Sequence, residues 1–212
     1  MTDHRIYWLM GEIDDEIRSN LSMVYYHVWD NYPYPKYNKK WYDSNDLVVT
    51  ISKVTDDIVR TVSPDVEVIY HPHAVPSDVF NPNRDPKEVK SLKKLIYRNT
   101  PEREEYFTFF WNSRNARRKQ SGSLLYWYRE FLDRLGHNKV NLIMHTDTKD
   151  PHGQDLEKII NELNLTSGEV VFSTSKLDPS KMGILYNTID CTISVSDAEG
   201  FGLSMLESLS CA

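Results

Sequence analysis

The stretch Ser194–Ala212, SVSDAEGFGLSMLESLSCA, contains the turn from which the fold class of this chain can be read. The apolar run Cys191–Val195 predicts a short strand, and a helix is expected to begin at about Gly202. Backbone N–H groups at such a helix start attract anions, and the glycines Gly200 and Gly202 let a ligand approach the main chain closely. The sequence therefore predicts a strand, an anion-binding turn and a helix in this order.

The same alternation of strand and helix recurs upstream of this turn. The expected strands are Tyr106–Phe110, Asn141–His145 and Glu169–Phe172, and the expected helices are Lys87–Asn99, Ser123–Leu135, Asp155–Leu163 and Met182–Asn187. Such alternation indicates a parallel sheet with helices on its faces, so we predict a doubly wound α/β domain. In these sheets ligands bind beyond the carboxyl ends of the strands, which directs attention to the loops that follow residues 110, 145, 172 and 195.

A further α/β unit is predicted nearer the N-terminus. Its expected strands are Leu21–Trp29, Leu47–Ile51 and Val66–Tyr70, with a helix that Ser52 caps. The prolines between residues 71 and 86 argue against continuous secondary structure there, so a boundary is placed in this segment. We predict a partial N-terminal domain at 1–76, a linker with a connecting helix at 77–100, and a second domain at 101–212.

Composition indicates a folded protein without a membrane span. Hydrophobic residues make up 40% of the chain, with only 8 glycines and 10 prolines, which argues against disorder. No apolar run approaches the length of a membrane-spanning helix, and residues 1–12 mix charges with aromatics rather than forming a leader. The two cysteines, Cys191 and Cys211, form no CxxC pair, which favours a reducing, cytoplasmic location. Peripheral contact with a membrane stays open.

The charge distribution argues against nucleic-acid binding but singles out one loop. The net charge is −6 and the pI about 5.6, whereas nucleic-acid affinity depends on neutralising many phosphates. Four basic residues nevertheless lie in six positions after an expected strand: Arg114, Arg117, Arg118 and Lys119. Two interpretations stay open, a solvated basic loop and an anion-binding loop.

Two carboxylates accompany the glycine turn. Glu199 and Glu207 are eight residues apart. Carboxylates accept hydrogen bonds from hydroxyl groups, which both a sugar and a ribose offer. Spacing alone is equally consistent with two solvated glutamates beside an ordinary turn.

The segment from Glu199 to Glu207 resembles the E-x7-E signature of the retaining glycosyltransferases of family 4. The resemblance implies a GT-B fold of two Rossmann-like halves, and transfer of a sugar from a nucleoside diphosphate sugar with retention of anomeric configuration. It also implies that Glu199 lies by the donor sugar, that Glu207 contacts the ribose, and that the turn faces the donor phosphates. The residues of that turn are Gly200, Phe201, Gly202 and Leu203.

The run FTFFWNSRNARRK, Phe107–Lys119, resembles the strand and cationic clamp that hold the donor diphosphate in this family. Arg114 and Lys119 are the expected clamp and catalytic cations, while Arg117 and Arg118 remain open as the second cation. Trp111 replaces a small residue of the family pattern, and the two cations are five rather than six positions apart. Because the chain contains no Asp-x-Asp triplet, we expect neither a metal nor a cofactor beyond the donor substrate.

A weaker resemblance covers the N-terminal unit. The tract HVWD, His27–Asp30, is similar to the acceptor-side motif whose histidine approaches the transferred sugar, so His27 is a candidate catalytic residue, with a structural role as the open alternative. No motif identifies the acceptor, and a glycan, a lipid and a small molecule all stay open.

The resemblance runs from Leu21 to Ala212 and implies a chain truncated at both ends, with a partial N-terminal half and an incomplete donor half. A hexosyl or related transferase is the expected activity, and a non-catalytic nucleotide-sugar-binding remnant or scaffold is the alternative. The base and sugar of the donor and the oligomeric state stay open.

Overall fold

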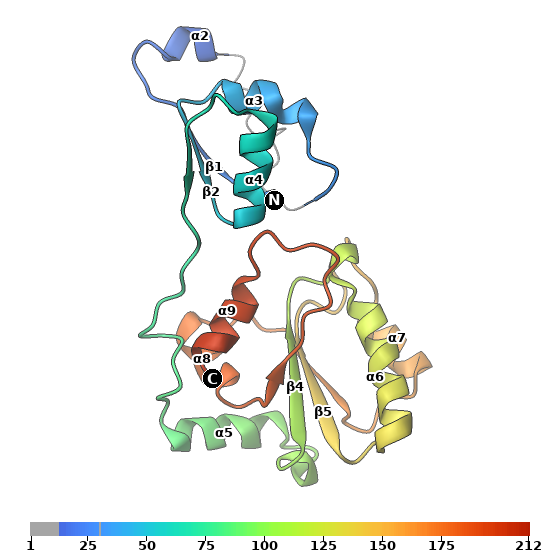
Figure 1. Cartoon of the computed structure of the whole chain (residues 1–212). Coiled ribbons are helices and arrows are strands. Elements are labelled where there is room, and N and C mark those ends of the chain that lie inside the picture. The colour runs from blue at the N-terminus through green and yellow to red at the C-terminus, as the bar shows by residue number, and fades with distance from the viewer. Residues whose placement is uncertain (1–12, 30) are drawn as a thin grey trace. The chain divides into compact units, whose positions relative to one another are not determined.

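The computed structural model describes residues 13–29 and 31–212, which form two compact units (Figure 1). The first unit comprises residues up to Ala74 together with Ala198–Gly202, and the second comprises Val75–Asp197 together with Leu203–Ala212. The predicted absence of a leader at residues 1–12 and the position of Asp30 lie outside the described residues. None of the helices in the described residues combines the length and the apolar composition that a membrane span requires.

The first unit is built on a three-stranded parallel sheet in the order β1-β2-β3. The strands are β1 (Val24–His27), β2 (Leu47–Thr50) and β3 (Val68–Tyr70), and the helices are α2 (Asp14–Ile17), α3 (Lys39–Asp43) and α4 (Lys53–Val62). Ser52 caps α4 as predicted, since its hydroxyl accepts from the Thr55 N–H at 3.1 Å. The short helices α2 and α3 were not predicted, because neither shows a helical repeat of apolar residues.

The second unit contains a four-stranded parallel sheet in the order β6-β5-β4-β7. Its strands are β4 (Phe107–Asn112), β5 (Val140–His145), β6 (Val170–Ser173) and β7 (Cys191–Thr192). Its helices are α5 (Pro86–Ile96), α6 (Ser121–Leu135), α7 (Leu156–Glu162), α8 (Pro179–Tyr186) and α9 (Leu203–Ser210). The predicted α/β pattern is confirmed, and the bounds differ from the predicted ones by a few residues.

Alternation along the central strands produces two apolar layers. Trp111 and Leu142 belong to the cluster beneath α6 and α7. Phe110 and Ile143 belong to the cluster on the other face, with residues of α5, α8 and the segment after α9 (Figure 1). Both faces of the sheet are therefore buried, as a doubly wound domain requires. Trp111, which departs from the family pattern, fills the layer beneath α6 and is 1% exposed.

Three of the helices in the second unit begin at an aspartate that caps them. Asp85, Asp155 and Asp178 accept hydrogen bonds from backbone N–H groups in the first turns of α5, α7 and α8. Each cap satisfies a donor that the helix leaves unpaired. The caps of Asp155 and Asp178 fix the points at which the loops after β5 and β6 end.

We expect Leu142→Ala to lower the free energy of unfolding of the second unit by about 2–5 kcal/mol, because Leu142 is fully buried in the centre of the sheet. Urea unfolding followed by tryptophan fluorescence measures the change. Leu209→Ala is the matched control, since that side chain is 70% exposed and its removal leaves no cavity. Equal losses in the two variants would contradict the assignment of the core.

Candidate functional site

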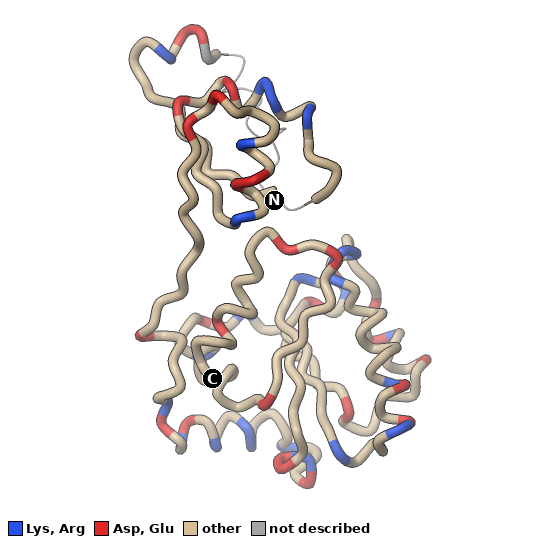
Figure 2. Tube along the Cα trace, viewed as in Figure 1, with Lys and Arg blue, Asp and Glu red and all other residues tan. Residues whose placement is uncertain are grey.

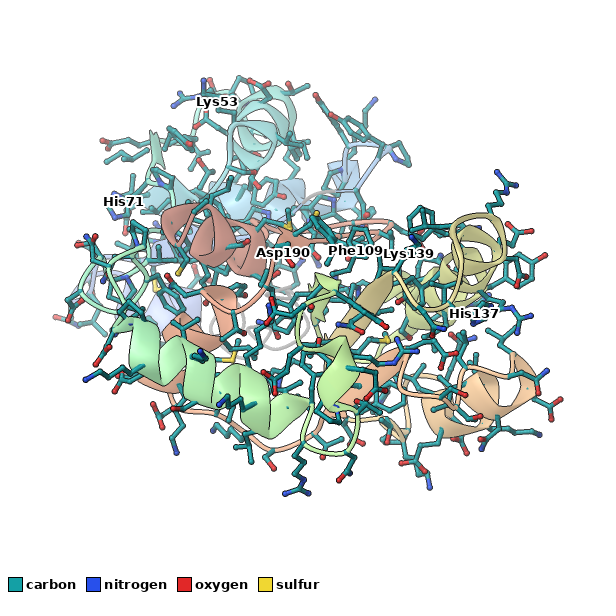
Figure 3. The ribbon with its side chains drawn as sticks, turned by 90° about the horizontal axis from the view of Figure 1, so that it is seen from below. Lys53, His71, Phe109, His137, Lys139 and Asp190 are labelled. Atoms are coloured by element: carbon teal, nitrogen blue, oxygen red, sulfur yellow. The ribbon has the colours of Figure 1, made fainter. Side chains whose placement is uncertain are left out.

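The carboxyl ends of β4, β5 and β6 lie at one edge of the sheet. Asn112 is paired with His145, and His145 is paired with Ser173 across the parallel ladders. The loops that leave these strands therefore start side by side, as the sequence predicted. The labelled side chains His137, Lys139 and Asp190 (Figure 3) precede β5 and β7 and so belong to the opposite, amino-terminal edge.

Asn115 joins the loop after β4 to the loop after β5. Its side chain is completely buried, and its amide donates to the carbonyl of Gln154 at 2.6 Å. Its Oδ1 accepts from the Ser121 hydroxyl at 2.7 Å and from the Gln154 N–H at 3.2 Å. Gly153 is required beside it, because a Cβ there would lie 2.1 Å from the carbonyl oxygen of Asn115. Asn115 was not a predicted site residue, because the partner that joins it to the second loop, Gln154, is 39 positions away in the sequence.

The basic segment Arg114–Lys119 follows β4 directly (Figure 2). The residues Arg117–Lys119 form a short 3-10 helix, and Gln120 next to it adopts a left-handed conformation with φ 55° before α6 starts. The Arg117 N–H donates to the carbonyl of His152 at 3.3 Å. The basic segment is thus an ordered part of this edge rather than a loop that extends into solvent.

Arg114 is held by the loop that follows β5. Its Nε donates to Asp150 Oδ2 at 2.6 Å, and its Nη2 donates to Asp150 Oδ1 at 3.1 Å and to His152 Nδ1 at 2.9 Å. The Arg114 side chain is 61% exposed and that of Asp150 only 10%. The hydrogen bonds from Arg114 hold the pKa of Asp150 far below its ordinary value, so the carboxylate stays ionised. Asp150 was not a predicted site residue.

The end of the basic segment, with Lys119 and the neighbouring Gln120, is tied to the loop after β7. Lys119 is 7% exposed, which is unusual for a lysine. The Gln120 amide donates to both oxygens of Asp197 at 2.9 and 2.8 Å. The carbonyl of Arg118 accepts from the Asp197 N–H at 2.9 Å. Three strands of the sheet therefore contribute loops that are tied together at this edge.

Glu207 lies in α9 and is hydrogen-bonded to α8. Its Oε2 accepts from the hydroxyl of Tyr186 at 2.8 Å, and that hydroxyl accepts from the Asn112 amide at 2.9 Å. Burial raises the pKa of Glu207, and the hydrogen bond from Tyr186 opposes the rise. Tyr186 and Asn112 were not among the predicted site residues.

At the end of β5, the His145 Nδ1 lies 2.8 Å from Ser173 Oγ. Burial lowers the pKa of His145, which favours the neutral ring.

The glycine turn itself belongs to the first unit. Gly202 has φ +82°, a conformation that favours glycine, and Leu203 begins α9. At Gly200 a Cβ would lie 2.3 Å from Val28 Cγ1. The ring of Phe201 packs edge-on against His73 at 5.2 Å between centroids.

The predicted site residues therefore fall into two sets. Arg114, Arg118, Lys119, Leu203 and Glu207 belong to the second unit, and Glu199, Gly200, Phe201, Gly202 and His27 belong to the first.

His27 is a core residue of the first unit in this structure. It is 1% exposed, and its Nε2 lies 2.8 Å from the hydroxyl of Tyr42. The rings of Tyr25 and Trp29 lie on either side along the strand, with centroids 4.8 and 6.4 Å away. This position supports the structural alternative for His27, because a ring so enclosed does not present its edge to a ligand. The prediction of a catalytic role for His27 gains no support from this geometry.

Within residues 13–29 and 31–212, no group of three or more His, Cys, Asp or Glu side chains is arranged to hold a metal ion. Cys191 and Cys211 are both free thiols.

No protein-family model matches the sequence, and neither does any curated protein. Solved structures do match. One is the α,α-trehalose 6-phosphate synthase from Burkholderia multivorans, at 12% identity with a TM-score of 0.75, over 95% of this chain and 51% of the other. Another is the E. coli trehalose 6-phosphate protein bound with UDP-2-fluoro glucose, at 13% identity, TM-score 0.71, and 95% and 54% coverage.

The pneumococcal O-GlcNAc transferase GtfA, in complex with UDP and GlcNAc, matches at 14% identity with a TM-score of 0.63, over 94% of this chain and 37% of that one. The chain thus spans about half the length of the first two proteins. The shared architecture is the GT-B fold, with Rossmann-like α/β halves around parallel sheets. The fold that the sequence resemblance implied is confirmed.

We expect Asn115→Ala to lower the free energy of unfolding of the second unit by about 1–3 kcal/mol, because it removes the buried amide that bonds to the Ser121 hydroxyl and to the backbone of Gln154. Hydrogen exchange should also become faster at the N–H of Gln154, which loses its acceptor. Asn138→Ala serves as the control, since it changes an asparagine at the other edge of the sheet. Unchanged exchange at Gln154 would contradict the role of Asn115.

Proposed function

We propose that this chain is part of a glycosyltransferase that moves a sugar from a nucleoside diphosphate sugar to an acceptor, with retention and without an obligatory metal. The observation that carries the proposal is the ordered cationic loop at the carboxyl edge of the second unit's sheet, where Arg114 is held in place and Lys119 is buried. The fold supports it, since similar structures were solved with UDP or a UDP-sugar analogue.

The cations supply what the chemistry of the donor requires. Breaking the bond between sugar and phosphate builds negative charge on the departing nucleoside diphosphate, and fixed positive groups stabilise that charge. We assign this role to Arg114 and Lys119, with Arg118 as a further contact. Positive side chains can neutralise a diphosphate without a divalent metal, so we infer a metal-independent reaction and no other cofactor.

The carboxylates and the turn complete the proposed donor site. We assign Glu207 to the ribose hydroxyls, Glu199 to the donor sugar, and the turn of Gly200, Phe201, Gly202 and Leu203 to the phosphates. These roles, with membership of family 4 and retention, rest on the E-x7-E resemblance. A hexose is the proposed sugar, the cytoplasm is the proposed location, and the acceptor is left unassigned.

We expect Arg114→Ala and Lys119→Met each to weaken binding of UDP by roughly ten- to hundred-fold, because each removes a charge-assisted hydrogen bond to the diphosphate. Isothermal titration calorimetry measures the affinity, and uridine without phosphates should be unaffected by either change. Arg134→Ala is the matched control, since this exposed arginine lies in the last turn of α6, away from the cationic loop.

The same titration tests the independence from metal. Adding EDTA should leave the affinity for UDP unchanged, and a loss of binding on chelation would overturn the metal-free clamp.

The salt dependence of binding distinguishes the class of ligand. An affinity that falls steeply with salt, as many phosphate contacts produce, would favour nucleic acid as the ligand instead.

We expect the two glutamates to differ in which part of the donor they affect. Glu207→Gln should weaken both UDP and its sugar conjugate by roughly tenfold or more, since it removes a charged acceptor from the ribose hydroxyls. Glu199→Gln should weaken the sugar conjugate while leaving free UDP nearly unaffected. Four calorimetric titrations make the comparison. If both variants lost equal affinity for both ligands, the glutamates would only support the turn.

A further inference from the structure

A chain of hydrogen bonds links three elements of the second unit to Glu207. The Asn112 amide, at the end of β4, donates to the hydroxyl of Tyr186 in α8 at 2.9 Å. That hydroxyl lies 2.8 Å from Glu207 Oε2 in α9. Because an amide NH2 group only donates, the phenol oxygen accepts from Asn112, and its single hydrogen is directed to the carboxylate.

The ring of Tyr186 is fixed by its surroundings. Its side chain is 3% exposed, and it packs edge-on against Phe110 and Phe80, with centroids 5.3 and 6.0 Å away. Burial raises the pKa of Tyr186 far above its ordinary value, so the hydroxyl keeps its proton and remains a donor. The hydroxyl therefore offers Glu207 a hydrogen at one fixed point.

We propose that Tyr186 is a positioning residue for the ribose contact, holding Oε2 of Glu207 so that Oε1 is presented to the ribose diol. This inference rests on the proposed function, since it requires that Glu207 meets a ribose. A glutamate side chain has several rotatable bonds, and binding that must first fix them is weakened by the lost freedom. A carboxylate that is already oriented avoids this loss.

The same hydrogen bond affects the charge of Glu207. Desolvation favours the protonated acid, and the bond from Tyr186 favours the carboxylate that a diol needs as acceptor. Among the described residues, Cys211, just after α9, also lies beside the pair; burial raises the pKa of its thiol, and the charge of Arg84 opposes that rise. Without the phenol, the pKa of Glu207 should rise further. As the pH is lowered, the carboxylate should then be protonated earlier, and binding of the diol should be lost at a higher pH value than in the wild type.

The test compares UDP with its 2′,3′-dideoxy analogue by calorimetry, in the wild type and three variants. Tyr186→Phe removes the hydroxyl and keeps the ring. Asn112→Asp keeps the phenol but gives it a competing carboxylate acceptor, so its proton is drawn away from Glu207. Tyr128→Phe is the matched control, because this buried hydroxyl bonds only to the carbonyls of Val140 and Glu169 among the contacts described.

We expect the wild type to prefer UDP over the dideoxy analogue by roughly tenfold or more, and both Tyr186→Phe and Asn112→Asp to reduce that ratio by about fivefold. The affinity for the dideoxy analogue should not change in these variants. A general loss of structure would instead weaken the binding of both ligands. Tyr128→Phe should keep the full ratio. The pH at which UDP binding weakens should move upward in Tyr186→Phe, together with the Glu207 pKa followed by carboxyl NMR.

Two failures are distinguishable. If the wild type shows the ribose preference and Glu207→Gln abolishes it, but Tyr186→Phe retains it, the positioning role of Tyr186 is overturned while the proposed function stands. If the wild type binds no nucleoside diphosphate, or shows no ribose preference, the proposed donor site is overturned, and the inference with it.

Discussion

The parallel pairing of β4 with β5 is the constraint on which the rest of the second unit depends. It sets Asn112 opposite His145, so both strands end at the same edge and release their loops next to each other. The alternation that this register imposes also sends Phe110 and Ile143 to one apolar layer and Trp111 and Leu142 to the other. A shift by one residue would bury the wrong side chains and separate the two loops.

The aligned loops need a further device to become a rigid edge, and Asn115 supplies it. One buried amide bonds to groups on both loops, and Gly153 allows the close approach of their backbones. With the loops joined, Asp150 can hold Arg114, and Gln120 can reach Asp197. The order of dependence runs from strand register to loop junction to the orientation of the cations.

Much of this could be predicted from the sequence, and the reason lies in the range of each signal. Strands such as Val140–His145 and helices such as Ser121–Leu135 can be predicted from the pattern of consecutive residues. The basic segment after β4 can be recognised from its run of positively charged residues. The bonds from Asn115 to Thr148 and Gln154 and from Tyr186 to Glu207 could not be predicted, because they join residues 33, 39 and 21 positions apart in the sequence. The burial of His27 could not be predicted from the sequence either, because its hydrogen-bond partner Tyr42 lies in α3, a helix that was not predicted.

The ion pair between Arg114 and Asp150 places a carboxylate beside the proposed phosphate site, where its charge offsets that of the guanidinium. The geometry resolves this. Three of the five N–H groups of the guanidinium are used by Asp150 and His152, at Nε and Nη2, and they fix the plane of the group. The two N–H groups of Nη1 are then oriented without further loss of side-chain freedom, and more than half of the side chain is exposed. A diphosphate carries more negative charge than one carboxylate and also meets Lys119 in the proposed site. We therefore expect the affinity gained from a pre-oriented Arg114 guanidinium to exceed the affinity lost because Asp150 offsets its charge.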